Sequence, residues 1–251
     1  MSQSPPPPPQ NNIYGGGFFN FVPRDFAQHL RDRAISKLGS GASGEAWHYV
    51  LTYLSTSNVT YSMNVAIKIP HDDDEDLRKE ALFLSRVDSP YVIKLLFAGE
   101  SNGSYKLTTE LFGRRVTLQS RSSASDAVKR QILSHILIGL ESLHKKNIIH
   151  GDFGPHNVLI NENNEVKIID LGFSEDVRAA ATEVTNILGD SELLTAKTDM
   201  MGVGKIIELL YPGTTNTLVQ TTMNGCLNRI PANRATLGVV YSNVFGPQWP
   251  K

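Results

Sequence analysis

The sequence predicts an α+β protein with a small, sheet-rich first half and a larger, helical second half. Between residues 34 and 110, short β-branched runs alternate with glycine-containing turns, a pattern typical of strands. From residue 125 onward, apolar residues recur at helical spacing instead. The 251 residues, 40% of them hydrophobic, are enough to bury a sizeable core. We therefore expect a sheet and a helical body with the ligand site in a cleft between them.

Three strands are expected in the first half, at 34–38, 46–54 and 64–69. The first two flank a glycine-rich turn, and the third is a short β-branched run that extends the sheet. An exposed hairpin tip is expected over 55–62, because this stretch is polar and separates two strand-forming runs. The resulting sheet is antiparallel.

Two helices are predicted from apolar periodicity. The first, over 76–87, places Leu77, Ala81 and Leu84 on one face, and Ser89-Pro90 ends it. The second covers 127–144, where the apolar positions at helical spacing are Val128, Ile132, Leu133, Ile136, Leu140 and Leu143. The single helix of the first half therefore interrupts a sheet, whereas the second helix begins the helical body.

Composition excludes several classes of protein. A formal net charge of −1 provides no basic field, so neither nucleic acid nor a membrane surface is an expected partner. A single cysteine, Cys226, excludes an internal disulfide framework. No apolar run is long enough to span a bilayer, and the N-terminus lacks a secretory signal pattern. We expect an intracellular protein, cytoplasmic or nuclear.

The first 17 residues have the composition of a disordered tail. Five prolines, Pro5 to Pro9, are followed by Gln10, Asn11 and Asn12, which favour solvated polyproline II and cannot bury a core. Such a run is most often a passive spacer, and docking to an SH3 or WW module is the alternative. The folded domain is therefore expected over residues 18–251.

The polar groups with the clearest chemistry lie in the second half. Asp152 and Asn157 are five positions apart in the stretch 150–157, and Asp170 follows after an apolar segment. Two carboxylates and one side-chain amide are the groups needed to hold a nucleotide-bound magnesium ion and an attacking hydroxyl. This pattern indicates phosphoryl transfer.

The first half supplies groups that suit phosphate binding. Gly39, Gly41 and Gly44 lie between two expected strands, where glycines let backbone N–H groups approach phosphates closely. An ordinary flexible hairpin is the alternative interpretation of these glycines. A dinucleotide-binding turn is disfavoured, because its glycines would have to begin a helix and a strand is expected here instead. Lys68 ends an apolar strand, and Glu80 on the following helix is its expected ion-pair partner.

The ordered combination of these motifs resembles the protein kinase family over about residues 35–245. The motifs are, in order, Gly39-x-Gly41-x-x-Gly44, Val65-Ala-Ile-Lys68, Glu80, His150-x-Asp152-x-x-x-x-Asn157 and Asp170-x-Gly172. The resemblance implies a bilobal protein-kinase-like fold, with an antiparallel β N-lobe containing one helix over about 18–111 and a helical C-lobe over about 112–251. Only about forty residues follow Leu210, so the C-lobe is expected to be trimmed.

The resemblance also implies a role for each residue, with ATP as co-substrate, Mg²⁺ as cofactor and a protein as phosphate acceptor. Asp152 would orient the substrate hydroxyl, Asn157 and Asp170 would hold magnesium, and Lys68, held by Glu80, would fix the α- and β-phosphates. The three glycines would cover the phosphates. The residues implied at adenine are Ala46, Ala66 and Leu159 on its faces, with Thr109, Glu110 and Phe112 along its edge.

Other parts of the second half fit the same family pattern. Asp199, at the start of an expected helix, would brace the backbone of the 150–157 loop. Arg234 resembles the late arginine of the helical lobe, and we expect it to pair with Glu192.

Two glycines depart from the family pattern. Gly151 stands where many protein kinases have arginine, so the site that receives an activation-loop phosphate is missing. We therefore predict activity without phosphorylation of Thr182 and Thr185. Gly154 stands where a lysine commonly contacts the γ-phosphate, which removes one positive charge from the transition state.

Three functions remain open from the sequence. A serine/threonine protein kinase is favoured over tyrosine specificity, because the alanine and arginine motif of tyrosine kinases is absent after Asp152. The 150–157 stretch also resembles aminoglycoside and choline phosphotransferases, although no large substrate-site insertion is visible. A non-catalytic pseudokinase scaffold is the third possible function.

An acidic substrate would suit the positive charges of Arg114, Arg115 and Arg121. The alternative is that these arginines form a solvated face.

Overall fold

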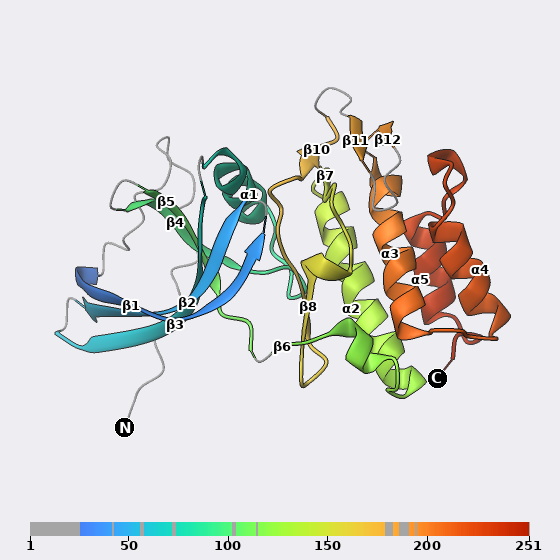
Figure 1. The fold of residues 1–251 in the computed structure, drawn as a ribbon, viewed down its shortest axis with the longest axis horizontal. Helices are drawn as coiled ribbons and strands as arrows, with labels where there is room; N and C mark the ends of the chain where they lie inside the picture. Colours follow the sequence, from blue (N-terminus) through green and yellow to red (C-terminus); the bar gives the residue numbers. More distant parts are fainter. Residues whose placement is uncertain are drawn as a thin grey trace. The chain divides into compact units, whose positions relative to one another are not determined.

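The computed structural model describes most of the chain as two compact units (Figure 1). The described ranges are 26–41, 43–55, 58–71, 74–101, 104–113, 115–178, 183–185, 191–193 and 195–250. The first unit contains the described residues up to Ser85 together with Lys94–Leu111, and the second contains Arg86–Ile93 and the described residues from Phe112 onward. The proline-rich stretch 1–17, with its suggested SH3 or WW partner, lies outside these ranges.

The first unit is built on a five-stranded antiparallel sheet in the order β1-β2-β3-β5-β4. Its strands are β1 (Phe26–Gly41), β2 (Gly44–Ser55), β3 (Thr60–Ile69), β4 (Leu95–Ser101) and β5 (Ser104–Glu110). Leu51, Val65 and Ile67 form the buried side of β2 and β3, as expected for alternating side chains. The predicted antiparallel sheet is therefore confirmed.

Strand β1 is longer than the predicted 34–38. Its pairing with β2 extends from Gly41 opposite Gly44 to Phe26 opposite Ser55, with several register shifts along the way. Because a β-bulge absorbs an extra residue, the ladder continues through a stretch whose sequence does not alternate. The hairpin expected between β2 and β3 is present, with Leu54 opposite Thr60.

Helix α1 (Glu75–Ser85) is the one helix described in the first unit (Figure 1). Leu77, Ala81 and Leu84 are buried, as predicted, and the helix packs against β4 and β5. Glu75 and Asp76 lie in its first turn, where negative charge is stabilised by the helix dipole. The helix ends two residues before the predicted position, at Ser85, whose hydroxyl donates to the carbonyl of Leu82.

The second unit is predominantly helical, which confirms the α+β class. Its elements in order are β6 (Arg115–Val116), η1 (Leu118–Arg121), α2 (Asp126–His144), β7 (Ile148–Ile149), η2 (Pro155–Asn157), β8 (Val158–Asn161), β9 (Val166–Ile168), β10 (Glu175–Asp176), β11 (Glu183–Thr185), β12 (Ser191–Leu193), α3 (Ala196–Leu210), α4 (Thr217–Cys226), η3 (Pro231–Asn233) and α5 (Leu237–Phe245). The short strands pair as β6-β8-β9, β7-β10 and β11-β12. Strands of two to four residues are too short to produce a periodic signal in the sequence.

Helix α2 forms the centre of this unit. The hydroxyl of Ser125 caps it by accepting from the N–H of Val128. Its inward face is fully buried at Ile132, Leu133, Ile136, Leu137, Leu140 and Leu143. The helix packs against α3, α5 and β9, and five of the six predicted apolar positions are fully buried, whereas Val128 is only partly buried.

The last helices, α4 and α5, close the second unit against α3 and α2. Trp249, after α5, is 1% exposed, and its Nε1 donates to the hydroxyl of Tyr211 at 3.2 Å. This contact fixes the chain after α5 to the end of α3. No helix among the described residues has the length and apolar character required to cross a membrane.

Candidate active site

The first unit joins Lys68 and Glu80 in an ion pair, as the sequence predicts. Nζ of Lys68 lies 2.8 Å from Oε2 of Glu80, and the two side chains are 14% and 4% exposed. Lys68 is the penultimate residue of β3, and Glu80 lies beside the buried face of α1. Because Glu80 is almost fully buried, the ammonium of Lys68 is held at a defined position on the sheet.

The sheet register places the other expected residues of the first unit close to Lys68. Ala46 lies opposite Lys68, and Ala66 lies opposite Thr109. Residues directly opposite in an antiparallel pair share a face, and so do residues two apart in one strand. These four side chains therefore project from one face of the sheet. Glu110 ends β5 in the same unit, and its N–H donates to the carbonyl of Lys94.

The glycine-rich turn connects β1 to β2, with Gly41 opposite Gly44. Gly44 has φ +151°, and a Cβ there would lie 2.2 Å from the carbonyl oxygen of Ile69. Only glycine fits this close approach, so Gly44 has a packing reason that is independent of any ligand. At Gly39, by contrast, the structure describes no atom within 4 Å of the Cβ position, which leaves room above the strand.

In the second unit, Asp152 and Asn157 are joined within the 150–157 loop. Nδ2 of Asn157 donates to the backbone carbonyl of Asp152 at 2.9 Å and to its Oδ2 at 3.1 Å. A carbonyl oxygen can only accept, so this contact fixes which end of the amide is the nitrogen. Oδ1 of Asn157 therefore points away from Asp152.

Asp170 lies at the same end of the β8–β9 hairpin as Asn157. Val158 pairs with Ile168, and the ladder continues one step as the N–H of Ile169 donates to the carbonyl of Asn157 at 3.0 Å. Asp170 itself has φ +63°, a left-handed conformation that costs a non-glycine residue free energy and that Asp tolerates better than most. The hairpin thus brings together two residues that are separated in sequence.

The donor atoms of Asn157 and Asp170 suit magnesium. Mg²⁺ prefers oxygen ligands and is usually bound through one or two protein side chains together with substrate phosphates and water. An amide oxygen turned away from Asp152 and one carboxylate therefore fit a metal carried by a nucleotide.

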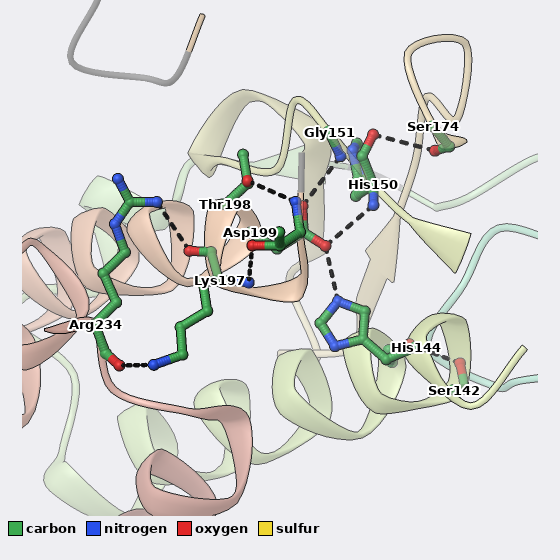
Figure 2. Close-up of polar contacts among 11 residues, drawn as sticks. Ser142, His144, His150, Gly151, Ser174, Lys197, Thr198, Asp199 and Arg234 are labelled. Carbon is green, nitrogen blue, oxygen red and sulfur yellow. Dashed lines mark hydrogen bonds and ion pairs between the residues drawn. The ribbon is translucent and has the colours of Figure 1, made fainter. Parts of the chain in front are cut away.

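Asp199 holds the beginning of the 150–157 loop, as predicted (Figure 2). It is fully buried at the start of α3, and its Oδ2 and Oδ1 accept from the N–H groups of His150 and Gly151, each at 3.0 Å. Nε2 of His144, at the end of α2, lies 2.8 Å from Oδ2. Three donors around one buried carboxylate fix the loop backbone to both helices.

His150 is also held by hydrogen bonds to residues on both sides of Asp170. Nε2 of His150 lies 3.0 Å from the carbonyl of Ile169, and the backbone carbonyl of His150 accepts from the hydroxyl of Ser174 (Figure 2). Gly151 has φ +83°, a conformation that suits glycine. The residue that replaces the family's arginine is therefore also well suited to the local backbone.

An ionic cluster forms around Asp176, in the segment after Asp170. The guanidinium of Arg86 donates to Oδ2 of Asp176 at 2.9 Å and to the carbonyl of Lys146 at 2.7 Å. Arg178 forms a second, bidentate pair with the same carboxylate. The hydrogen bonds from Arg178, followed by that from Arg86, hold the pKa of Asp176 far below its usual range. This carboxylate is therefore a fixed negative charge.

The late arginine, Arg234, is 2% exposed and braces the start of α3. Its guanidinium donates to the carbonyls of Asn228 and Lys197, and Nζ of Lys197 donates back to the carbonyl of Arg234 (Figure 2). The side chain of Glu192 is outside the described part of the chain, so the predicted Glu192–Arg234 pair stays a prediction.

Of the three arginines suggested to favour an acidic substrate, Arg121 is engaged within the second unit. Arg121 donates to the carbonyls of Asn161 and Glu162, which ties it to the β8–β9 turn. Arg114 and the side chain of Arg115 are outside the described residues. The remaining two expected nucleotide contacts, Phe112 and Leu159, both belong to the second unit.

Two contacts in the second unit do not follow from the motifs of the sequence. Nε2 of His156 lies 3.1 Å from Oδ2 of Asp152, and the spacing of four positions was the available signal. Arg86 reaches Asp176 across 90 positions, and no local pattern predicts such a contact.

Comparison with known proteins identifies the family. The protein kinase domain model matches residues 33–210, which is most of the chain, so the chain belongs to the protein kinase family. It is 29% identical to the MAP kinase kinase MKK1/SSP32 of Saccharomyces cerevisiae, over 62% of this chain and 33% of that protein. It is 31% identical to a probable serine/threonine-protein kinase MRK1 homolog of Encephalitozoon cuniculi, over 74% of this chain and 62% of that protein.

A third relative is the serine/threonine-protein kinase pkn2 of Myxococcus xanthus, which is 28% identical over 66% of this chain and 21% of that protein. The matched region thus spans between about a fifth and less than two thirds of these relatives. The similarity concerns the kinase domain and not their full length.

Proposed function

We propose that this chain is an ATP-dependent serine/threonine protein kinase that uses Mg²⁺. The observation that carries the proposal is the linked set in the second unit, where Asn157 donates to Asp152 at the hairpin end that also holds Asp170. This arrangement provides an acceptor for a hydroxyl proton beside two oxygen ligands for a metal. The Lys68–Glu80 pair of the first unit supplies the positive charge for the α- and β-phosphates.

In the proposed reaction, the substrate hydroxyl oxygen bonds to the γ-phosphorus of ATP. The bond from that phosphorus to the β–γ bridging oxygen breaks, and ADP leaves with its electrons. Asp152 orients the hydroxyl and accepts its proton, while Lys68 and the N–H groups of the glycine-rich turn bind the phosphates. Mg²⁺, held by Asn157 and Asp170, would neutralise phosphate charge.

The rest of the proposed nucleotide site follows the same assignment. Ala46, Ala66 and Thr109 lie on the Lys68 face of the sheet, as described above, and would contact adenine together with Glu110, Phe112 and Leu159. We take residues 18–251 as the kinase domain and place the boundary between its lobes at Leu111 and Phe112. The chain passes from the first compact unit to the second at the same position.

Serine/threonine preference is supported by the names of two of the relatives above. The tyrosine-protein kinase transforming protein Abl of Abelson murine leukemia virus is also 30% identical, over 55% of this chain and 19% of that protein. Identity alone therefore does not separate the two specificities. The absence of a tyrosine-kinase pattern after Asp152 favours the serine/threonine assignment.

The proposal is tested with purified full-length chain, radiolabelled ATP and Mg²⁺. The acceptors are a mixed protein panel and a panel of amino- and hydroxyl-bearing small molecules, with Asp170→Asn as the inactive control. Phosphoserine or phosphothreonine on protein is the expected product. Transfer only to small molecules would favour a phosphotransferase of the aminoglycoside or choline type, and nucleotide binding without transfer would favour a pseudokinase.

A further inference from the structure

Asp152 has a hydrogen-bond partner to which the proposed reaction gives no role. Nε2 of His156 lies 3.1 Å from Oδ2 of Asp152, four positions further along the loop. An ionised carboxylate has only acceptors, so Nε2 carries the proton in this contact. We propose that His156 is a positioning residue that holds the Asp152 carboxylate in the orientation that receives the substrate hydroxyl.

Two side chains converge on one oxygen of Asp152. Nδ2 of Asn157 donates to Oδ2 at 3.1 Å, and Nε2 of His156 donates to the same oxygen. The terminal torsion of an aspartate is broad and is not fixed by staggering alone. Two donors on Oδ2 restrict this torsion. Among the described residues, no hydrogen bond reaches Oδ1, so Oδ1 is the oxygen that remains for the hydroxyl.

Gly154 explains why this chain needs such a donor. It lies between Asp152 and His156 and has no side chain with which to reach either the carboxylate or a phosphate. Its backbone is extended, with φ −172° and ψ −179°, so the conformation of the loop itself does not require glycine. The 3₁₀ turn η2 then carries the ring of His156 back to Asp152. After Asp152, the first side chain of the loop that can donate an N–H is therefore that of His156.

The exposure of the pair makes a purely structural role a poor explanation. The side chains of His156 and Asp152 are 52% and 47% exposed. Exposed pairs of this kind contribute little to folding stability, because both groups are well solvated when separated. The benefit of the contact is thus orientation at the place where a substrate arrives. This inference rests on the proposed function, since it assumes that Asp152 faces a hydroxyl.

The test compares His156→Ala with His156→Gln in the full chain, using ATP, Mg²⁺ and a protein acceptor from the panel. Glutamine places an amide nitrogen near the position of Nε2, so it retains the donor without the ring. We expect His156→Ala to lower kcat about tenfold, because a misoriented reacting group reduces the rate without weakening nucleotide binding. KM for ATP and the unfolding midpoint should stay at their wild-type values, and His156→Gln should recover most of kcat.

Lys145→Ala is the matched control, since it removes another exposed contact between residues four apart, the 2.9 Å pair with Glu141. It should leave kcat unchanged. A His156→Ala enzyme with wild-type kcat would overturn the inference, and so would equal losses in His156→Ala and His156→Gln.

The Asp152→Asn background separates the inference from the proposed function. There, His156→Ala should cause no further loss, because the carboxylate that it positions is gone. An additional loss in the double variant would contradict the positioning role. A wild-type chain that transfers phosphate to no hydroxyl would instead refute the proposed function, and the positioning role with it.

Discussion

Nζ of Lys68 and Oε2 of Glu80 lie 2.8 Å apart inside the first unit, with Glu80 only 4% exposed. Replacing Lys68 by methionine removes the ammonium from a nearly buried carboxylate. We expect the free energy of unfolding to fall by about 1–3 kcal/mol and kcat/KM to fall at least about a hundredfold. Chemical denaturation and the kinase assay measure the two effects.

Lys205→Met is the control for this prediction, because the Lys205–Glu208 pair at 2.9 Å is half-exposed. Its unfolding free energy should change by less than about 0.5 kcal/mol, with activity retained. Full activity in Lys68→Met would exclude Lys68 from phosphate binding.

The second prediction concerns a glycine of α3 that touches the loop. A Cβ at Gly202 would lie 2.0 Å from the carbonyl oxygen of Phe153, the residue after Asp152. Alanine normally stabilises a helix interior by about 1 kcal/mol relative to glycine. Here we expect Gly202→Ala to lower both the unfolding midpoint and kcat, because the loop backbone must move away.

Gly225 in α4 provides the matched comparison. A Cβ there would meet the Cβ of Ala235 at 3.4 Å, an ordinary van der Waals contact. Gly225→Ala should therefore leave kcat unchanged and stabilise the chain by up to about 1 kcal/mol. If both variants behaved alike in thermal unfolding and in the kinase assay, the close approach of α3 to the loop would be wrong.

The third prediction follows from the ionic cluster at Asp176. The pKa of Asp176 is lowered chiefly by hydrogen bonds from Arg178 and additionally by Arg86. A lowered pKa in the folded state contributes stability above the unfolded pKa of about 3.9, and this contribution is lost as the pH falls toward the folded value. Wild type should therefore have a higher Tm than Asp176→Asn at pH 7, and the difference should shrink below about pH 4. A difference that grew in acid would contradict this sign.

The fourth prediction concerns regulation by phosphorylation. Thr182 and the side chain of Thr185 lie outside the described residues, so the prediction rests on Gly151 and on the charge at Asp176. Glycine offers no cation for a phosphate, and a carboxylate already occupies Arg86 and Arg178. The double variant Thr182→Ala, Thr185→Ala should therefore retain wild-type activity. Loss of activity in a correctly folded double variant would show that phosphorylation is required.

The fifth prediction uses the reactivity of the single cysteine as a measure of how tightly α4 is packed. Cys226 is fully buried in α4, and burial raises the pKa of its thiol to about 12. At pH 8 the native chain should react with a thiol reagent orders of magnitude more slowly than the chain in denaturant. Immediate stoichiometric labelling of the native protein would contradict the packing of α4 against α3.

Much of the fold follows from local patterns in the chain. The buried face of α1 and the apolar positions of α2 were predicted from periodicity, because helical spacing reports which side chains share a face. The bulged extension of β1 and the short strands of the second unit were not predicted. The extension of β1 depends on bulged pairing with β2 and not on alternation in its own residues, and strands of two to four residues leave no periodic trace.

In the candidate site, too, some contacts were predicted from the sequence and others were not. The Lys68–Glu80 pair was predicted from motif spacing, because adjacent elements bring these two residues together. Asp152 and Asn157 were placed in one loop, but the hydrogen bonds between them were not predicted. The contact between His156 and Asp152 was missed although the residues are only four apart. Their side chains meet because η2 turns the chain at that point.

By itself, the sequence determined that a sheet with one helix precedes a helical body, together with the family of the chain and the chemical types of its site residues. These depend on local periodicity and on motif spacing. The tertiary structure alone decided that His144 would join the loop at the buried carboxylate of Asp199, and that Gly202 would touch the carbonyl of Phe153. Such contacts arise when helices pack against a distant loop, and their geometry depends on the whole core.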